Sequence, residues 1–280
     1  MHDTLTGGRL GGCAYLSWPG PLALAHRGGC GGVVENSRAA LEHVTRLGLR
    51  YFETDVHCTA DGVVVLLHDD TVDRTTDGRG RLADLTWEQA ARLRDRSGDR
   101  LVRLDEALAD YPGLRFNIDL KEDAAVAATL RVVAAAGAWD RVCLASFSDR
   151  RLRVVRRLTG GRVATSLGQR ETARLLVAAN GGPASGVPTP HGSPARRAMA
   201  VQVPVEFRGV RVVTPAFVRR AHRLGLAVHV WTVDDAPTMH RLLDLGVDGL
   251  VTDRPTVLRA VLRARGEWVE ADPAPSRTEL

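Results

Sequence analysis

The stretch LALAHRGGCGG, residues 22–32, joins a short apolar run to a histidine, an arginine and several glycines. A run of this length suits a buried strand, and His26 and Arg27 stand where it ends. Glycine lets main-chain amides approach a ligand closely, and arginine binds phosphate or carboxylate through its fork of donors. The stretch predicts a strand that delivers two cations to a ligand. An ordinary turn would fit it equally well, so the rest of the chain has to decide.

Similar apolar runs recur along the chain and alternate with patterns typical of amphipathic helices. Helical stretches such as SRAALEHVTRLG and FVRRAHRLG end in glycine, as helices that return to a sheet often do. Strand-then-helix units repeated eight times predict an α/β fold of the (β/α)8 TIM-barrel type, with an open doubly wound sheet as the alternative. The predicted strands are residues 22–26, 51–56, 115–120, 142–147, 162–167, 200–204, 227–233 and 249–253.

Three segments depart from this rhythm. Residues 1–20 are predicted to be an N-terminal extension of a single barrel domain that covers residues 21–264. After the apolar run VVVLLH, the polar residues 69–100 are too long for a plain loop and predict an insertion with its own helix in TWEQAARLR. The tail, residues 265–280, is predicted to be disordered.

Composition narrows the class of protein. The chain has 280 residues, 44% of them hydrophobic, and a net charge of +5 that suits an anionic substrate. Its arginines are scattered, without the basic run and interleaved aromatics of a nucleic-acid-binding protein. No signal peptide and no membrane span are predicted, and the four cysteines lack paired spacing, so we expect reduced thiols in a cytoplasmic protein. These cysteines are Cys13, Cys30, Cys58 and Cys143.

Two pairs of charged residues lie near predicted strand ends. Glu53 and Asp55 are two residues apart, as are Asp119 and Lys121, so each pair shares one face of its strand. Lys121 is the single lysine of the chain, which favours a specific role for a compact ammonium. Three inward carboxylates need a cation, and Mg²⁺ or Ca²⁺ would satisfy them. Ion pairs with arginines are the alternative.

Histidines supply groups that exchange protons near neutral pH. His68 ends the run VVVLLH and would join His26 as a second such group. His57 shares a strand face with the Glu53 pair and could support the site, whereas His229 is predicted to be core. Trp231 lies at the predicted barrel mouth, where it would cover part of a substrate or simply pack in the core.

A series of motifs then resembles one family. AHRGG, ENS, FETDVHCTADGVVVLLHDDTVDRTTDGRG, NIDLK, VWTVDD and GVDGLVTDRP occur in this order between about residues 21 and 262. Together they closely resemble the glycerophosphodiester phosphodiesterases, which are TIM barrels with an insertion after the His-Asp motif. The resemblance implies that His26 and His68 form an acid/base pair and that Glu53, Asp55 and Asp119 are metal ligands. It also implies that Arg27 and Lys121 bind the phosphate and that Glu35 and Asn36 support the site.

One departure concerns the predicted metal site. The family usually has glutamate where this chain has Asp119, which is one methylene shorter. We therefore expect metal identity and affinity to differ from the family pattern.

The predicted activity is the metal-dependent hydrolysis of glycerophosphodiesters to sn-glycerol 3-phosphate and an alcohol. The family resemblance favours attack by the 2-hydroxyl of the substrate through a cyclic phosphate, with direct attack by water as the alternative. Two other functions remain open: a lipid- or inositol-directed phosphodiesterase of the same barrel type, and a non-catalytic phosphoester-binding protein. A metal-dependent amidohydrolase is disfavoured, because its first strand would carry HxH rather than His-Arg-Gly. An oligomer is possible.

Overall fold

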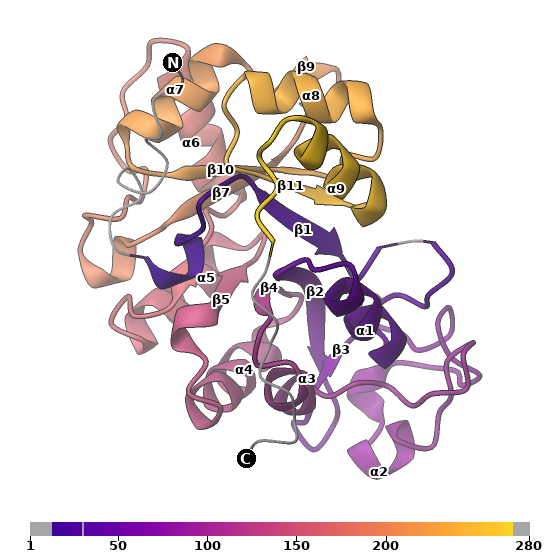
Figure 1. The fold of residues 1–280 in the computed structure, drawn as a ribbon. Coiled ribbons are helices and arrows are strands. Elements are labelled where there is room, and N and C mark those ends of the chain that lie inside the picture. The colour runs from indigo at the N-terminus through magenta and orange to yellow at the C-terminus, as the bar shows by residue number, and fades with distance from the viewer. Residues whose placement is uncertain (1–12, 30, 271–280) are drawn as a thin grey trace.

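Strands and helices alternate around a barrel in the computed structural model, which describes residues 13–29 and 31–270 (Figure 1). The parallel strands follow the order β6-β5-β4-β2-β1-β11-β10-β7. A parallel bridge between Ser166 and Ala200 links the two ends of this order, so the barrel is nearly closed. The strands are β1 (Leu22–His26), β2 (Tyr51–Cys58), β4 (Arg115–Leu120), β5 (Val142–Ala145), β6 (Ala164–Thr165), β7 (Ala200–Pro204), β10 (Ala227–Trp231) and β11 (Gly249–Thr252).

Helices follow every parallel strand and cover the outside of the barrel (Figure 1). In α1 the Ser37 side chain accepts from the Ala40 amide at the start, and Gly48 follows the end at a φ of +74°. Both are standard signals that begin and end a helix. The covering helices are α1 (Arg38–Arg46), α3 (Leu104–Asp110), α4 (Asp123–Ala135), α5 (Asp149–Leu158), α6 (Gln169–Ala179), α7 (Pro215–Arg223), α8 (Ala236–Asp244) and α9 (Pro255–Ala264). The predicted TIM barrel is therefore confirmed and the open sheet is excluded.

The segment between β2 and α3, residues 59–103, leaves the barrel and is called the insertion below. It begins with β3 (Val64–Leu66), which pairs antiparallel with the end of β2. The run VVVLLH is therefore the return strand of a hairpin and is no part of the barrel wall, and His68 comes two residues after β3 rather than at its end. The helix predicted in TWEQAARLR is only the short α2 (Trp87–Ala90).

The insertion has an apolar cluster of its own. It is formed by Val65, Leu67, Val72, Leu82, Ala90 and Leu101, all of them buried. A second buried cluster lies inside the barrel around Tyr15, Leu24 and Tyr51, and the largest one lies between the strands and the covering helices. The insertion therefore has a small apolar core of its own, while its residues Val64, Leu66 and Val102 pack in the largest cluster.

Both predicted terminal segments partly belong to the folded domain. Tyr15 of the N-terminal extension is buried, and its carbonyl accepts a hydrogen bond from the Tyr51 hydroxyl at 2.8 Å. The tail is placed as far as residue 270, and Trp268 packs under the guanidinium groups of Arg259 and Arg263. Residues 1–12 and 271–280 lie outside the described residues. Within the described ranges no helix is both long and apolar enough to cross a bilayer.

Smaller elements complete the loops. A two-stranded hairpin of β8 (Glu206–Phe207) and β9 (Val210–Arg211) follows β7, and a connection of residues 180–199 leads from α6 to β7. Short 3-10 helices cover Ala14–Leu16, Leu82–Asp84, Trp139–Arg141 and Pro194–Arg196. The thiols of Cys13, Cys58 and Cys143 are free, whereas Cys30 lies outside the described residues.

Candidate active site

The predicted carboxylates lie on adjacent strands at the carboxyl end of the barrel. Glu53 and Asp55 project from β2, and Asp119 projects from β4 as the direct register partner of Asp55. His26, the last residue of β1, is the register partner of Glu53. All three carboxylates are buried. Because active sites of TIM barrels form at this end, the arrangement is the best candidate for the active site.

Two cations lie against these carboxylates. Lys121 Nζ is 2.7 Å from Asp55 Oδ1 and 2.7 Å from Asp119 Oδ2. Burial alone would lower the pKa of Lys121, but the charges of Asp119 and Asp55 outweigh it and raise that pKa above its ordinary value. Arg27 Nε is 3.0 Å from Asp55 Oδ2, in an ion pair without hydrogen-bond geometry. The arginine ion pair that the sequence left as an alternative is therefore present at Asp55, whereas Asp119 pairs with Lys121.

Glu53 has weaker contacts with cations than Asp55 and Asp119 have. Its carboxylate accepts a weak contact from the Arg27 amide at 3.3 Å and lies 3.9 Å from His26 Nε2. Burial, reinforced by the negative charges of Asp55 and Asp119, raises the pKa of Glu53 to about 8. Burial and the neighbouring carboxylates therefore disfavour the ionised form of Glu53, which a further cation at the site would favour.

The same residues can be tested as a metal site. Within residues 13–29 and 31–270 no three histidine, cysteine or acidic side chains converge closely enough to enclose an ion. The Lys121 ammonium bridges Asp55 and Asp119 instead. The donor chemistry nevertheless fits, because among the described residues Asp55 Oδ2 is buried without a hydrogen-bond partner, and a cation would offset the burial and like charges that raise the pKa of Glu53. Carboxylate oxygens of this kind suit Mg²⁺ or Ca²⁺.

His26 is oriented by a carboxylate that the sequence reasoning missed. Its Nδ1 lies 2.8 Å from Oδ1 of Asp253, the first residue after β11, which places Nε2 on the side of Glu53. Burial lowers the pKa of His26, but the hydrogen bond with Asp253 and the charge of Glu53 more than offset this and raise it above 6.5. Asp253 stands in GLVTDRP, where its position after an apolar run was the available signal.

His68 is oriented in the same manner by its neighbour. Its Nδ1 lies 2.7 Å from Asp69 Oδ1, and its backbone carbonyl accepts a hydrogen bond from His57 Nε2 at 3.2 Å. His57 also lies 3.7 Å from Glu122 through Nδ1, so it supports the His68 segment. The Arg74 guanidinium, which donates to Asp69, and the His68 ring lower the pKa of Asp69 to about 2. The roles of Asp69 and Arg74 were not predicted.

The ENS motif supports the arginine loop. The Glu35 carboxylate accepts a hydrogen bond from Arg27 Nη1 at 3.2 Å, and the backbone N–H of Asn36 donates to the backbone carbonyl of Arg27 at 2.9 Å. Asn36 Oδ1 accepts from the Thr54 hydroxyl at 2.7 Å, which ties the motif to β2. Arg27 and Asn36 adopt φ values of 52° and 56°, a region that residues other than glycine rarely occupy. The loop is thus held in a strained conformation by these contacts.

The glycines after Arg27 have a packing role. A Cβ on Gly28 would lie 2.4 Å from the Ala40 Cβ of α1, and one on Gly29 would lie 2.5 Å from Pro255 Cδ of α9. Both also have positive φ values. These two glycines therefore let helices α1 and α9 approach the loop, which is a tighter requirement than an open path for a ligand.

Trp231 forms one side of the barrel mouth. It is the last residue of β10, and its ring lies 5.9 Å from that of Phe147 at an interplanar angle of 78°. Phe147 follows β5 and is 59% exposed. The pair forms an aromatic wall beside the site; the sequence reasoning named Trp231 and missed Phe147.

Comparison with known proteins agrees with this geometry. Residues 26–257 match the model of the glycerophosphoryl diester phosphodiesterase family. The chain belongs to this family. The "Probable glycerophosphodiester phosphodiesterase 2" of Mycobacterium tuberculosis is 40% identical over 91% of this chain and 95% of its own length. The glycerophosphodiester phosphodiesterase of Caldanaerobacter subterraneus is 29% identical over 88% of this chain and 99% of its own length.

Solved structures of family members have the same fold. A glycerophosphodiester phosphodiesterase from Agrobacterium tumefaciens aligns with a TM-score of 0.69 at 23% identity, over 86% of this chain and 98% of its own. An Oleispira antarctica phosphodiesterase, solved with the product sn-glycerol-3-phosphate, aligns with a TM-score of 0.70 at 21% identity, over 87% of this chain and 97% of its own.

Proposed function

We propose that this chain is a metal-dependent enzyme that hydrolyses glycerophosphodiesters to sn-glycerol 3-phosphate and an alcohol. Its family supports the phosphodiesterase activity, and the product bound to the Oleispira antarctica relative supports the glycerol phosphate unit. The observation that carries the proposal is the pair of histidines, His26 and His68, each fixed through Nδ1 by a carboxylate. A fixed imidazole of this kind presents Nε2 for proton transfer.

Arg27 and Lys121 would bind the substrate phosphate. Both cations lie against Asp55 in the active site, and Glu35 fixes the second end of the Arg27 guanidinium. The guanidinium suits two phosphate oxygens, and the ammonium acts as a point charge. Together they would stabilise the negative charge that develops on the phosphoryl oxygens in the transition state.

Glu53, Asp55 and Asp119 would hold the divalent metal. Asp55 Oδ2, which lacks a hydrogen-bond partner among the described residues, and the raised pKa of Glu53 support this assignment. When bound, Mg²⁺ or Ca²⁺ would supply Lewis acidity for the phosphate and for a substrate hydroxyl. An ion shared by the three carboxylates would compete with Lys121 for Asp55 and Asp119.

The two histidines would transfer protons to and from the substrate in two steps. First, one imidazole takes the proton of the 2-hydroxyl as its oxygen attacks phosphorus, and the other imidazole gives a proton to the leaving alcohol as the P–O bond to that alcohol breaks. A five-membered cyclic phosphate results, favoured by the high effective molarity of an internal nucleophile. In the second step the roles reverse: water attacks phosphorus, the P–O2 bond breaks and O2 regains its proton. sn-Glycerol 3-phosphate is the product.

Trp231 would contact the glycerol part of the substrate. The T-shaped contact with Phe147 fixes the indole at the mouth, where an apolar wall suits the CH₂ groups of glycerol.

We also propose that the protein is cytoplasmic, because its cysteines lack the paired spacing of a disulfide framework.

The direct test is release of glycerol 3-phosphate from a panel of glycerophosphodiesters, with and without chelator. The panel contains head groups from ethanolamine to inositol and one long-chain lysophospholipid. We expect release from the water-soluble substrates, loss of turnover with chelator and recovery with Mg²⁺ or Ca²⁺. Full turnover in metal-free protein would refute the metal dependence. Binding without release would favour a phosphoester-binding protein, and turnover of the lysophospholipid alone would favour a lipid-directed enzyme.

A second test addresses the nucleophile. A substrate whose 2-hydroxyl is replaced by hydrogen keeps the phosphate that Arg27 and Lys121 would bind. We expect it to inhibit competitively and to be turned over at least about a hundredfold more slowly, because it lacks the internal nucleophile. Hydrolysis at a comparable rate would show that water attacks directly.

A further inference from the structure

Arg74 connects the insertion to the barrel at the active site. Its Nε donates to Asp69 Oδ2 at 2.6 Å, while Nη1 and Nη2 donate to the two oxygens of Glu35 at 2.7 and 2.8 Å. Asp69 in turn contacts His68 Nδ1, and Glu35 contacts Arg27. One guanidinium therefore links the segment that carries His68 to the loop that carries Arg27.

We propose that Arg74 is a positioning residue that holds His68 and Arg27 in register for the reaction. The inference rests on the proposed function, because it assigns these two groups to proton transfer and phosphate binding. Without Arg74, Asp69 would lose its donor at Oδ2, and Glu35 would lose its two shortest hydrogen bonds and keep only the one from Arg27. Asp69 could then rotate away from His68, and the imidazole would lose its fixed direction.

The lowered pKa values of Glu35 and Asp69 agree with this assignment. Burial raises the pKa of Glu35, but the hydrogen bonds and charge of Arg74, together with Arg27, bring it below its ordinary value. Glu35 and Asp69 are thus both held as carboxylates by the same guanidinium. An ionised Asp69 is the form that accepts a hydrogen bond from His68 Nδ1.

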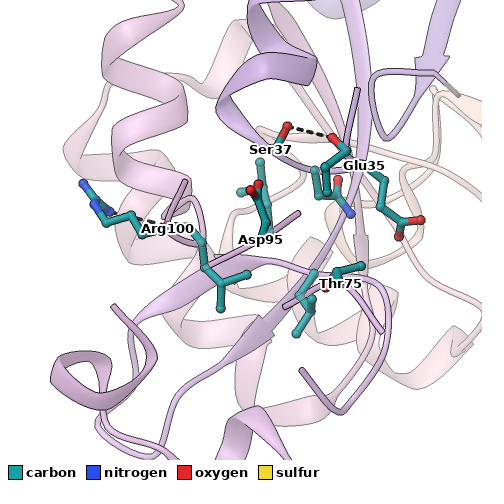
Figure 2. Close-up of a pocket in the computed structure, with 10 residues that line it drawn as sticks. Glu35, Ser37, Thr75, Asp95 and Arg100 are labelled. Atoms are coloured by element: carbon teal, nitrogen blue, oxygen red, sulfur yellow. Dashed lines mark hydrogen bonds between the residues drawn. The ribbon is translucent and has the colours of Figure 1, made fainter. Parts of the chain in front are cut away.

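A small gap lies between the insertion and the β1–α1 loop near Arg74. A cavity of about 10 Å³ separates the insertion from the barrel beside Glu35 (Figure 2). Asn36, Leu66, Thr75 and Leu101 help to line the cavity, and both Asn36 Nδ2 and Thr75 Oγ1 are buried without a hydrogen-bond partner among the described residues. The volume suits a single water molecule. The Arg74 ion pairs with Asp69 and Glu35 join the insertion to the β1–α1 loop near this gap.

An arginine is required by the geometry. Three nitrogens of one planar guanidinium donate hydrogen bonds to two carboxylates. A lysine ammonium on a flexible stem cannot reproduce this arrangement. Arg74 is also 45% exposed at the side chain, and the apolar cluster of the insertion does not include it. A change at Arg74 should therefore disturb the orientation of its partners much more than the stability of the fold.

The test compares Arg74→Gln and Arg74→Lys with a matched control, Arg79→Gln. Arg79 lies in the same insertion, is 85% exposed and contacts only Asp73 at 3.6 Å among the ion pairs of the described residues. Steady-state kinetics with the best substrate of the panel gives kcat and KM, and thermal unfolding gives Tm. We expect Arg74→Gln to lower kcat about tenfold or more while KM changes less than about threefold and Tm stays close to that of the control. Arg74→Lys should recover part of the loss.

A kcat of Arg74→Gln within about twofold of Arg79→Gln would overturn the proposal. So would a kcat loss that tracks a large fall in Tm and is not relieved by Arg74→Lys, since that pattern indicates a structural role. Failure of the proposed function would look different, because the unmodified protein itself would then release no glycerol phosphate.

Discussion

Lys121 shows how much depends on single residues in this site. The chain has 38 lysine and arginine residues, and Lys121 is the one lysine, placed between two buried carboxylates at 2.7 Å from each. A guanidinium is larger and planar, so it would not fit between Asp55 and Asp119 in the same way. The position of Lys121 between two carboxylates therefore favours a compact ammonium over a guanidinium.

We expect Lys121→Arg to retain charge and lose catalysis. A guanidinium in this position would displace Asp55 or Asp119 and present its charge at a different distance from the phosphate. The fall in kcat should be at least about tenfold, equivalent to about 1.4 kcal/mol of transition-state stabilisation. Steady-state kinetics checks this, with Tm as the control for folding. Near-normal kcat would show that catalysis does not need an ammonium at this position.

The sequence could predict residues that share one strand but not contacts made across the chain. Glu53 and Asp55, or Asp119 and Lys121, lie two positions apart, so strand periodicity alone places each pair together. Asp253 is 227 positions from His26, and its role depends on β11 closing the barrel beside β1. The ammonium bridge at Lys121 could not be predicted either, because it requires the observed register of β2 and β4.

At the scale of elements, the weakest part of the barrel wall has a buried ion pair beside it. β6 has only two residues, and a bridge at Ser166 joins it to β7. Arg156 of α5 is completely buried and donates to Glu171 of α6, to the Thr165 hydroxyl and to the Ser166 carbonyl. One side chain thus ties two helices to the short strand. The strand-then-helix alternation of the sequence implied helices after these strands, but it gave no reason to place an arginine in the core.

We expect Arg156→Met to destabilise the fold strongly, because it leaves the buried Glu171 without its cation. The loss in free energy of unfolding should be about 3–5 kcal/mol. Arg150→Met on the same helix is the control, since the Arg150–Asp123 pair is exposed and should contribute about 0–1 kcal/mol. Urea denaturation of both variants checks the difference. Equal losses would contradict the structural role of the buried pair.

The whole molecule is organised around a barrel whose interior is partly polar. Below the active site, Gln202 of β7 donates to Asn117 of β4 at 2.7 Å and lies 3.3 Å from His229 Nδ1. His229 of β10 was predicted to be core and is completely buried. Burial lowers its pKa to about 4, with a smaller opposing effect of Asp248. The barrel therefore encloses a neutral imidazole that the unfolded chain would expose to water.

This imidazole should make the protein less stable in acid. Between pH 6.5 and 4 the unfolded chain binds a proton at His229 that the folded chain does not, so the free energy of unfolding falls as the pH falls. The contribution is at most about 1.4 kcal/mol per pH unit. We expect His229→Gln to flatten the pH dependence of stability in this window, and the exposed His191→Gln to leave it unchanged. Parallel curves for His229→Gln and the unmodified protein would contradict the assignment.

The central claim is that His26 and His68, at the carboxyl end of the barrel, cleave a glycerophosphodiester. Phosphorus NMR of the reaction follows substrate, cyclic phosphate and glycerol 3-phosphate together for the unmodified protein, His26→Asn, His68→Asn and the control His43→Asn on helix α1. We predict that each active-site variant is at least about a hundredfold slower, as expected for loss of a general acid or base, while the control matches the unmodified protein. Glycerol 3-phosphate formed at near-normal rates by either active-site variant would contradict the catalytic role of the two histidines.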